Sequence, residues 1–497
     1  MNFGIVLKAI QANKTTFLNS SIKFIDVEQT TVFVKALQEN TALKSLYLFK
    51  NNIPCAGATA LAKAMHVNVT LINLFLTYNH LSDEAAIAFG EALQVNITLK
   101  GLNLANNIIG YTGAIALAKA LHVNVVVEHL DLSENDLKDA GATAFGEALQ
   151  VNKTLKGLHL KNNRIAEKGG IALAKGLHIN VVLKYLDLSE NHLSDEAATA
   201  LGEALQVNMT LKVLDVYENG IGPIGAAALA LGLQCNLFLK DLNLSNNKIS
   251  DEGAKALCKA LQKNFFLTDL DLSSNYISFA GATALADCLE VNVVLKHLIL
   301  SNNDIKFMGA LELSRALRIN MTLKTLNLSC NKISDIGATA LANALHVNVS
   351  LRILNCYLND ISDKGATAFA RALHENTTLT KLDVHDNIIG EEGLTAFDTV
   401  LQTNTTLTIL TLDDHECDPD FFYFPIFGEI NMKIERNMHL YNNTYWHPYL
   451  HNDFPPCSYH LFLTCLLCNA DVVSPLPILP FCVWKQVFSF FSRNYFY

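Results

Sequence analysis

At 497 residues, the chain is too long for one ordinary hydrophobic core, so several domains or a repeat array are expected. Hydrophobic residues make up 50% of the chain and charged residues 17%, which excludes a largely disordered protein. The formal net charge of -10 argues against a nucleic-acid partner, because phosphate contacts need clustered Lys and Arg, and it favours a protein partner with a basic surface.

The first residues and the cysteines predict the compartment. The opening stretch MNFGIVLKAIQANKTT lacks the apolar run and the small-residue cleavage site of a signal peptide, so we expect a cytoplasmic protein. The eleven cysteines are an odd number and most stand alone, which favours buried free thiols over a disulfide framework.

Residues 1–42 form the first predicted unit. The stretch VFVKALQEN at residues 32–40 matches the helical part of the later units, whereas the leucine pattern of a strand is lost around residues 17–23. The end turns of a repeat array must cover apolar faces that have no further neighbour. We therefore expect residues 1–42 to be an N-terminal capping unit, a degenerate repeat.

Residues 43–415 repeat one pattern. The motif L-x-x-L-x-L-x-x-N starts at Leu43, returns at Leu71 and recurs with that same period up to Leu407, which makes fourteen units without an insertion. Its alternating leucines predict a short strand with one buried face. A helix is predicted to follow, because pairs such as Leu61 and Met65 lie four positions apart and therefore share one helix face. A Gly often precedes this helix, and we expect it to permit a tight turn.

Two columns of asparagine run through the repeat. The first ends every predicted helix, from Asn40 to Asn404, and we expect a left-handed backbone there, which Asn tolerates. The second follows the predicted strands from Asn51 to Asn387. A buried carboxamide both donates and accepts hydrogen bonds, so this second column is predicted to join neighbouring turns and not to bind a ligand.

A longer period, twice the first and here called the double period, is present in the first half of the chain. AFGEALQVN at 88–96 returns at 144–152 and, as ALGEALQVN, at 200–208, while AKAMHVN at 62–68 and its relatives alternate with these stretches. Tandem duplication of a two-turn block is the simplest origin of this pattern. Turns that still match so closely indicate a scaffold with few specialised turns.

The consensus of the units is similar to a known repeat. Residues 239–261, LKDLNLSNNKISDEGAKALCKAL, resemble the leucine-rich repeat of the ribonuclease-inhibitor type and the repeat region of NOD-like receptors, and the resemblance covers roughly residues 13–415. It implies an α/β leucine-rich-repeat solenoid, a right-handed horseshoe with parallel strands on the concave wall and helices on the convex wall. For function the implication is weaker, because such repeats serve many partners.

Residues 416–497 differ in composition, with clustered aromatics and prolines such as YWHPYLHNDFPP at 445–456. We expect a C-terminal cap or a small domain there. Asp471 and the prolines of SPLPILP interrupt the apolar runs, so we expect no membrane span and no membrane partner. Residues 479–491, which begin Leu479-Pro480, resemble the opening of an F-box, whose helix docks a ubiquitin-ligase adaptor.

Sequence motifs of catalysis and ligand binding are not found. There is no G-x-x-x-x-G-K-[ST], H-E-x-x-H or G-x-S-x-G, so the nucleotide-binding motif of the full NOD-like receptors is absent, and we expect no enzyme, no cofactor and no small-molecule substrate. Cys465-x-x-Cys468 lacks a second pair at zinc spacing, so no metal site is expected. His66, His122 and His178 share one helix register and are interpreted as surface residues.

The strand positions between the leucines are expected to face the concave wall, the usual binding face of such horseshoes. Aromatic side chains beside acids are typical of protein-binding hot spots, and the acids would attract a basic partner. The predicted contact residues are Tyr47, Phe49, Phe75, Tyr78, Asp131, Glu134, Tyr185, Asp187, Glu190, Asp215, Tyr217 and Glu218. Asp241, Asp269 and Asp271 belong to the same strand positions, and a row of lysines at the strand entry, such as Lys184 and Lys240, is expected to neutralise this wall in part.

Together these features favour a non-enzymatic protein–protein interaction scaffold. Two alternatives stay open. Ran-GTPase-activating proteins use similar repeats, so a regulator of a small Ran-type GTPase is one, although the aromatic tail differs from the strongly acidic tail expected of them. A ubiquitin-ligase substrate receptor that acts through residues 479–491 is the other.

Overall fold

The computed structural model describes residues 3–19, 27–412 and 426–445. The chain divides into two compact units, Met1–Tyr441 and Asn442–Tyr497, and the first contains the whole repeat array. The F-box-like stretch at 479–491 and the pair Cys465 and Cys468 lie outside the described residues.

Fifteen short strands form one sheet in the described part of the chain. In chain order they are β1 (Phe17–Asn19), β2 (Ser45–Tyr47), β3 (Asn73–Phe75), β4 (Gly101–Asn103), β5 (His129–Asp131), β6 (Gly157–His159), β7 (Tyr185–Asp187), β8 (Val213–Asp215), β9 (Asp241–Asn243), β10 (Asp269–Asp271), β11 (His297–Ile299), β12 (Thr325–Asn327), β13 (Ile353–Asn355), β14 (Lys381–Asp383) and β15 (Ile409–Thr411).

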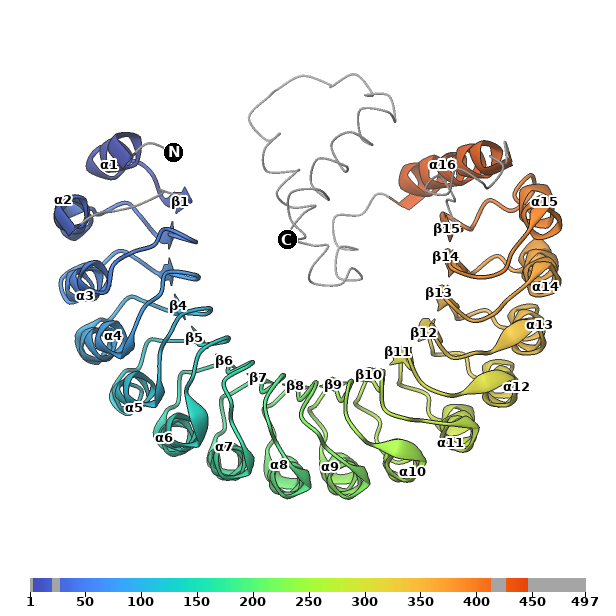
Figure 1. Cartoon of the computed structure of the whole chain (residues 1–497), viewed down its shortest axis with the longest axis horizontal. Helices are drawn as coiled ribbons and strands as arrows, with labels where there is room; N and C mark the ends of the chain where they lie inside the picture. The colour runs from blue at the N-terminus through green and yellow to red at the C-terminus, as the bar shows by residue number, and fades with distance from the viewer. Residues whose placement is uncertain (1–2, 20–26, 413–425, 446–497) are drawn as a thin grey trace. The chain divides into compact units, whose positions relative to one another are not determined.

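Sixteen helices alternate with these strands among the described residues, and α1 to α15 lie outside the strands (Figure 1). They are α1 (Phe3–Gln11), α2 (Val27–Glu39), α3 (Cys55–Ala64), α4 (Asp83–Val95), α5 (Tyr111–Ala120), α6 (Lys138–Val151), α7 (Glu167–Ile179), α8 (Asp195–Val207), α9 (Pro223–Cys235), α10 (Ser250–Leu261), α11 (Phe279–Val291), α12 (Lys306–Leu317), α13 (Ser334–Leu345), α14 (Asp363–Glu375), α15 (Glu391–Val400) and α16 (Ile426–Tyr445).

The sheet follows the order of the chain, and every neighbouring pair is parallel and in register. Leu46 therefore faces Leu74, which faces Leu102, always one period further along the chain. The predicted core residues Leu61 and Met65 are 1% exposed, so the helices pack against the strands as expected. The predicted α/β leucine-rich-repeat solenoid is confirmed, and its sheet is open and not closed into a barrel.

The first asparagine column is buried, but its predicted left-handed backbone is wrong. Asn236 has φ −78° and ψ 128°, an extended conformation. Its amide Nδ2 donates to the carbonyl oxygens of Leu205 and Asn208 in the preceding turn, both at 2.8 Å, and its Oδ1 accepts the backbone N–H of Leu239. The side chain joins two turns, which is why this position needs Asn and not merely a residue that tolerates a left-handed backbone.

The second asparagine column joins neighbouring turns as predicted. Nδ2 of Asn247 donates to the carbonyl oxygens of Val216 and Leu244 at 3.0 and 2.9 Å. Its Oδ1 accepts the backbone N–H groups of Asn219 and Ile221 at 3.1 and 2.9 Å. Because the carboxamide satisfies backbone groups of two turns, the column holds consecutive turns at a constant spacing.

The glycine at the start of the helices is required by close packing, and not by the tight turn expected from the sequence. Gly220 is the one glycine of the described residues with a positive φ, and it precedes its helix. A Cβ on Gly113 would lie 2.7 Å from Cβ of Ala86 and 2.8 Å from Oδ1 of Asp83 in the preceding turn. The carboxylate of Asp83 accepts the backbone N–H of Gly113 at 2.9 Å, so the two turns touch at this point.

The double period has a structural meaning in the packing of the helices. Gly146 on α6 and Gly202 on α8 occupy the same register, and a Cβ on either would lie 2.3 Å from a backbone carbonyl oxygen of the next helix. The equivalent residue of α7 is Ala174. Helices α6 and α7, and likewise α8 and α9, therefore pack more closely than α7 and α8 do.

A strand forms at the beginning of the array although the leucine pattern is lost there. Phe17–Asn19 pairs in parallel with Ser45–Tyr47, and Leu18 is buried. Asn40 donates to the carbonyl oxygen of Ile10 at 2.7 Å, which ties α1 to the first asparagine column. These contacts support the N-terminal capping unit over residues 1–42, which stays a prediction.

At the other end, α16 takes up the hydrogen bonds that a further turn would make. Asn437, which is fully buried, donates to the carbonyl oxygens of Asn404 and Leu407 at 3.0 and 2.7 Å. Arg436 donates to the carbonyl oxygen of Leu401 at 2.8 Å. The cap or small domain over residues 416–497 stays a prediction, because most of that segment lies outside the described residues.

Candidate functional site

The concave wall is formed by the first and third residues of each strand, since the middle residue is a buried leucine. Because the strands are in register, these residues form two rows that cross the sheet, with about 4.8 Å between neighbours. The first row contains Tyr185, Val213, Asp241 and Asp269, and the third row contains Asp187, Asp215, Asn243 and Asp271.

The predicted aromatic residues near the N-terminus, Tyr47, Phe49, Phe75 and Tyr78, make two separate ring contacts, and together with Phe17, which was not predicted, they are here called the N-terminal aromatic cluster. The rings of Tyr47 and Phe75 stack with centroids 4.1 Å apart and 7° between their planes. Phe17 lies 5.1 Å from Tyr47, and Phe49 meets Tyr78 edge-on at 5.3 Å. Phe49 and Tyr78 are 46% and 47% exposed, so the cluster offers apolar surface to a partner.

The predicted residues in the middle of the sheet belong to a denser acidic patch, here called the central acidic wall: Tyr185, Asp187, Asp215, Asp241, Asp269 and Asp271. Asp187 pairs directly with Asp215 across β7 and β8, and Asp241 pairs with Asp269 across β9 and β10. Like charges placed opposite each other on neighbouring strands repel, so this arrangement is unfavourable without a cation.

The pKa values of the central acidic wall reflect that crowding. Burial raises the pKa of Asp241 to about 7, and the carboxylates of Asp269 and Asp215 add to the effect. Burial, opposed by a hydrogen bond from the Tyr217 backbone, raises the pKa of Asp215 to about 6. Burial and the surrounding aspartates also raise the pKa of Tyr185. The wall therefore holds carboxyl groups that are poorly solvated and close together.

Asp187 is the exception within the wall. Burial opposes its ionisation, but hydrogen bonds from His159 and Ser189 outweigh burial and lower its pKa. At Asp241, burial and then the charges of Asp269, Asp215 and Asp271 raise the pKa. The expected partial neutralisation of the wall by lysines of the strand entry stays a prediction.

Replacement of Asp241 by Asn is expected to raise the free energy of unfolding by about 2 kcal/mol at about pH 8 and to leave it unchanged at about pH 4. The folded pKa near 7 lies above the ordinary value of 3.8, so the folded chain holds this proton more tightly, and stability is lost as the pH rises between those values. Urea unfolding at both pH values measures the difference. An equal gain at both values would contradict the electrostatic explanation.

Three predicted glutamates lie in turns after the strands and not in the strand rows. Glu134, Glu190 and Glu218 share one turn position with positive φ of 57°, 53° and 53°. Glu190 forms an ion pair with Lys161 at 2.7 Å, and Glu218 accepts a hydrogen bond from Asn246 at 2.7 Å. Their carboxylates are bound to the neighbouring turn at the rim of the wall, where Lys161 offsets the charge of Glu190.

Asp131 and Tyr217 lie at the border of the wall. Asp131, on β5, accepts a hydrogen bond from Asn103 at 2.7 Å. Tyr217 follows Asp215 and donates its backbone N–H to that carboxylate at 2.9 Å, and the carboxylate of Glu218 raises the pKa of its phenol. The structure thus brings the central predicted residues together, while β4, β5 and β6 separate them from the N-terminal aromatic cluster by about 20 Å.

Sequence reasoning missed several residues of the concave wall. His159 stacks on Tyr185 with ring centroids 4.5 Å apart, and Phe17 belongs to the aromatic cluster. Further along, Tyr357 stacks on His385, whose Nδ1 lies 2.5 Å from Oδ1 of Asp383. His159 could have been recognised from the sequence, because it occupies the same strand position as Asp187, one period earlier. Phe17 could not, since it lies where the leucine pattern is lost.

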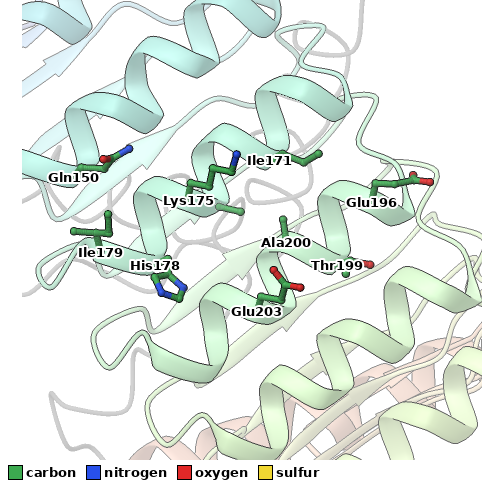
Figure 2. A pocket seen from close by; sticks show the side chains of 10 residues that line it. Gln150, Ile171, Lys175, His178, Ile179, Glu196, Thr199, Ala200 and Glu203 are labelled. Carbon is green, nitrogen blue, oxygen red and sulfur yellow. The ribbon is translucent and has the colours of Figure 1, made fainter.

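On the outer side, an open groove of about 650 Å³ runs between α7 and α8 (Figure 2). It lies between two closely packed helix pairs, and Lys175, His178, Glu196 and Glu203 are among its lining residues. His178 was interpreted as a surface residue, and it lines this open surface.

The described residues lack the features of two other classes of site. None of their helices has the length and apolar character needed to cross a bilayer. Within the same residues, no group of three or more His, Cys, Asp and Glu side chains is placed to hold a metal ion.

Comparison with known proteins agrees with the fold. A family model described as Leucine Rich repeat matches ten segments, residues 95–118, 123–146, 151–174, 180–202, 207–230, 235–258, 263–286, 320–342, 347–370 and 375–397. No curated protein matches the sequence. A solved structure titled Leiomodin-1 Actin-Binding Site 2 is 24% identical, with 33% of this chain and 92% of that chain covered and a TM-score of 0.29. The ten matched segments fall on turns of the open parallel sheet, and the chain is a leucine-rich-repeat protein.

Proposed function

We propose that this protein is a non-enzymatic scaffold that binds another protein on its concave wall, with the central acidic wall receiving a basic segment of the partner. Leucine-rich repeats generally serve as protein-interaction scaffolds, and no catalytic family is indicated. The observation that carries the proposal is the crowding of buried and half-buried carboxyl groups at Asp187, Asp215 and Asp241.

A Lys or Arg side chain placed among these carboxylates would relieve their mutual repulsion and form charge-assisted hydrogen bonds, which are the stronger kind in proteins. Tyr185, half-buried and stacked on His159, offers a rigid aromatic surface beside them. Aromatic anchors next to charged groups are a common composition of binding hot spots. The proposal therefore names a basic segment with at least one cationic side chain at β8 and β9.

The N-terminal aromatic cluster supplies a second contact in this proposal. It lies about 20 Å from Tyr185 along the same sheet, a span that an extended segment of about six residues covers. Exposed stacked rings bind apolar groups and, over their faces, cations. A partner with an apolar residue at one end of the bound segment and basic residues at the other would use both patches.

The test is binding of a short labelled peptide of alternating Arg and Ala to the full chain. The double replacement Asp215→Asn/Asp241→Asn is expected to weaken binding about tenfold, because two carboxylates that would face the peptide are lost. In the unchanged protein, binding should strengthen as the pH rises through about 6 to 7, where Asp215 and Asp241 ionise. Fluorescence anisotropy at several pH values measures both effects.

The matched control is Glu167→Gln/Glu392→Gln, which removes the same charge from exposed helix starts away from the concave wall. It is expected to leave binding unchanged. Equal weakening by both double variants would mean that the peptide senses only the overall charge, and the proposed site would be rejected.

The two alternatives, a regulator of a small Ran-type GTPase and a ubiquitin-ligase substrate receptor, stay predictions. Residues 479–491, on which the second depends, lie outside the described residues. Stimulated GTP hydrolysis by a Ran-type GTPase distinguishes the first alternative from a binding scaffold, and co-purification of a ubiquitin-ligase adaptor distinguishes the second. The cytoplasmic compartment likewise stays a prediction.

A further inference from the structure

The edge where each helix ends and the next strand begins carries the first asparagine column, the lysines of the strand entry and exposed apolar residues that no sequence motif singled out. Eleven consecutive turns, from Asn68 to Asn348, cross this edge at a buried Asn of the first column. The residues directly before and after that Asn are apolar at twenty of the twenty-two positions, and Lys153 and Lys263 are the exceptions.

The conformation of the Asn explains why its neighbours face solvent. At Asn236 the backbone is extended, and side chains of consecutive residues in an extended segment point in opposite directions. An inward Asn therefore turns both neighbours outward. Val123 and Val125, on either side of Asn124, are 59% and 75% exposed.

These outward side chains form one double row. Nineteen of them are among the large hydrophobic side chains that are exposed, with exposed fractions from 46% to 75%. The first-column asparagines bond from turn to turn, so the rows run along one edge for about 50 Å at the level of the sheet, and each row is interrupted once, at Lys263 and at Lys153. An exposed apolar surface of this extent marks a contact surface and not an ordinary solvated face.

The same edge is strongly basic. In the eleven stretches that run from two positions before the Asn to four positions after it, there are eleven of the 37 Lys and Arg residues of the chain but only two of its 47 Asp and Glu residues. Of those two acids, Glu128 is already paired with Lys100 and Lys156, and Glu290 is paired with Arg315. A chain with a net charge of -10 thus gathers positive charge on one edge.

The cations of this edge are close enough to repel one another. Burial, followed by the charges of Arg352 and Lys296, lowers the pKa of Lys324. Those three residues precede consecutive strands, β11 to β13, so the repulsion runs along the edge. Anions placed against the edge would relieve this repulsion.

We propose that this apolar and basic edge, the turns from Asn68 to Asn348, binds the surface of an anionic lipid bilayer, with the aliphatic double row between the lipid headgroups and the lysines against their phosphates and carboxylates. Aliphatic side chains rimmed by Lys and Arg are the composition of interfacial membrane-binding surfaces. The expectation of no membrane partner rested on the absence of a span, and peripheral binding needs none.

The charge of the edge argues against the other occupants. Two copies of this chain that met edge to edge would bring two basic rows together, which is repulsive. The lysines could contact the phosphates of a nucleic acid. Proteins bind single-stranded nucleic acid through aromatic side chains that stack on the bases, however, and this double row is almost entirely aliphatic. In such a complex the aliphatic side chains would remain exposed to water. The proposal does not depend on the concave wall, because that wall is the inner face of the sheet and the proposed membrane-binding surface lies along its edge.

The test is co-sedimentation of the full chain with vesicles of phosphatidylcholine alone or with about 30% phosphatidylserine. We expect binding to the anionic vesicles only. The triple replacement Lys184→Glu/Lys212→Glu/Lys240→Glu should lower the partition coefficient by about a hundredfold. The control Lys168→Glu/Lys248→Glu/Lys364→Glu changes the charge equally at the opposite helix ends and should stay within about threefold of the unchanged chain.

A second set of variants tests the aliphatic rows. Val181→Ser/Met209→Ser/Leu237→Ser is expected to lower the partition coefficient about tenfold, because the apolar contribution to interfacial binding is lost. Ile224→Ser/Ile336→Ser/Ile388→Ser removes equally exposed side chains from the opposite edge and should have no effect. Circular dichroism checks folding of each variant, and the milder set Lys184→Gln/Lys212→Gln/Lys240→Gln replaces any charge reversal that fails to fold.

Three outcomes overturn the proposal. The first is binding to neither vesicle, and the second is equal loss in edge and control variants. The third is evidence for a different occupant. Single-stranded RNA could bind more tightly than the anionic vesicles, in a way that depends on the lysines but not on Val181, Met209 and Leu237. Alternatively, light scattering could show a dimer that the serine variants dissociate. None of these results bears on the Arg-Ala peptide assay, so failure here is distinguishable from failure of the concave site.

Discussion

Replacement of Asn247 by Ala is expected to lower the free energy of unfolding by about 4 kcal/mol, a large loss for a single substitution. Its carboxamide is 3% exposed and holds backbone groups of two turns, with Nδ2 on Val216 and Leu244 and Oδ1 on Asn219 and Ile221. Alanine would leave several of these groups buried without a partner, at about 1–3 kcal/mol each before relaxation. Urea denaturation followed by circular dichroism measures the loss.

Asn343→Ala is the control for that experiment. Asn343 is exposed in the last turn of α13, and Ala is a good helix former, so the change should stay within about 0.5 kcal/mol. Because stability in a repeat array builds up from neighbouring turns, Asn247→Ala should also separate unfolding into two steps. A loss under about 1 kcal/mol would contradict the role assigned to the second asparagine column.

Replacement of Gly202 by Ala is expected to lower the free energy of unfolding by about 2 kcal/mol, although Ala is the better helix former. The new Cβ would lie 2.3 Å from the carbonyl oxygen of Ala228 on α9 and 2.6 Å from its carbon. Backbone atoms cannot rotate away as a side chain can, so α8 and α9 must move apart and lose packing along their length. Thermal and urea unfolding measure the effect.

Gly157→Ala tests whether crowding by backbone is the cause. Its Cβ would come within 2.7 Å of Nδ1 of His129, the far end of a side chain on the concave wall that can rotate. We expect less than about 0.5 kcal/mol there. Similar losses in both variants would point to a general cost of replacing glycine and not to the close helix pairing.

Much of the fold followed from the sequence, because each turn of a solenoid contacts only its two neighbours. A leucine at Leu46, Leu74 and Leu102 meets the same surroundings each time, so one constant period predicts strand, register and core together. Of the candidate site, Tyr185, Asp187 and Asp215 were predicted and lie together. The packing of His159 on Tyr185 and that of Phe17 on Tyr47 were not predicted, since ring contacts depend on side-chain directions and not on spacing alone.

The sequence by itself determined the repeat, its leucine rows and the role of the second asparagine column, since a leucine or an asparagine that returns at a constant offset meets the same neighbours in every turn. Only the tertiary structure decided why Gly113 must be glycine, which backbone conformation Asn236 adopts and that exposed aliphatic side chains lie beside the row of lysines. The net charge of -10 does not reveal the basic edge, because it adds up charged residues that lie on different surfaces of the folded chain. In the solenoid, residues that lie one period apart become neighbours, so one lysine per turn forms a row. A partner binds to this row and not to a single lysine.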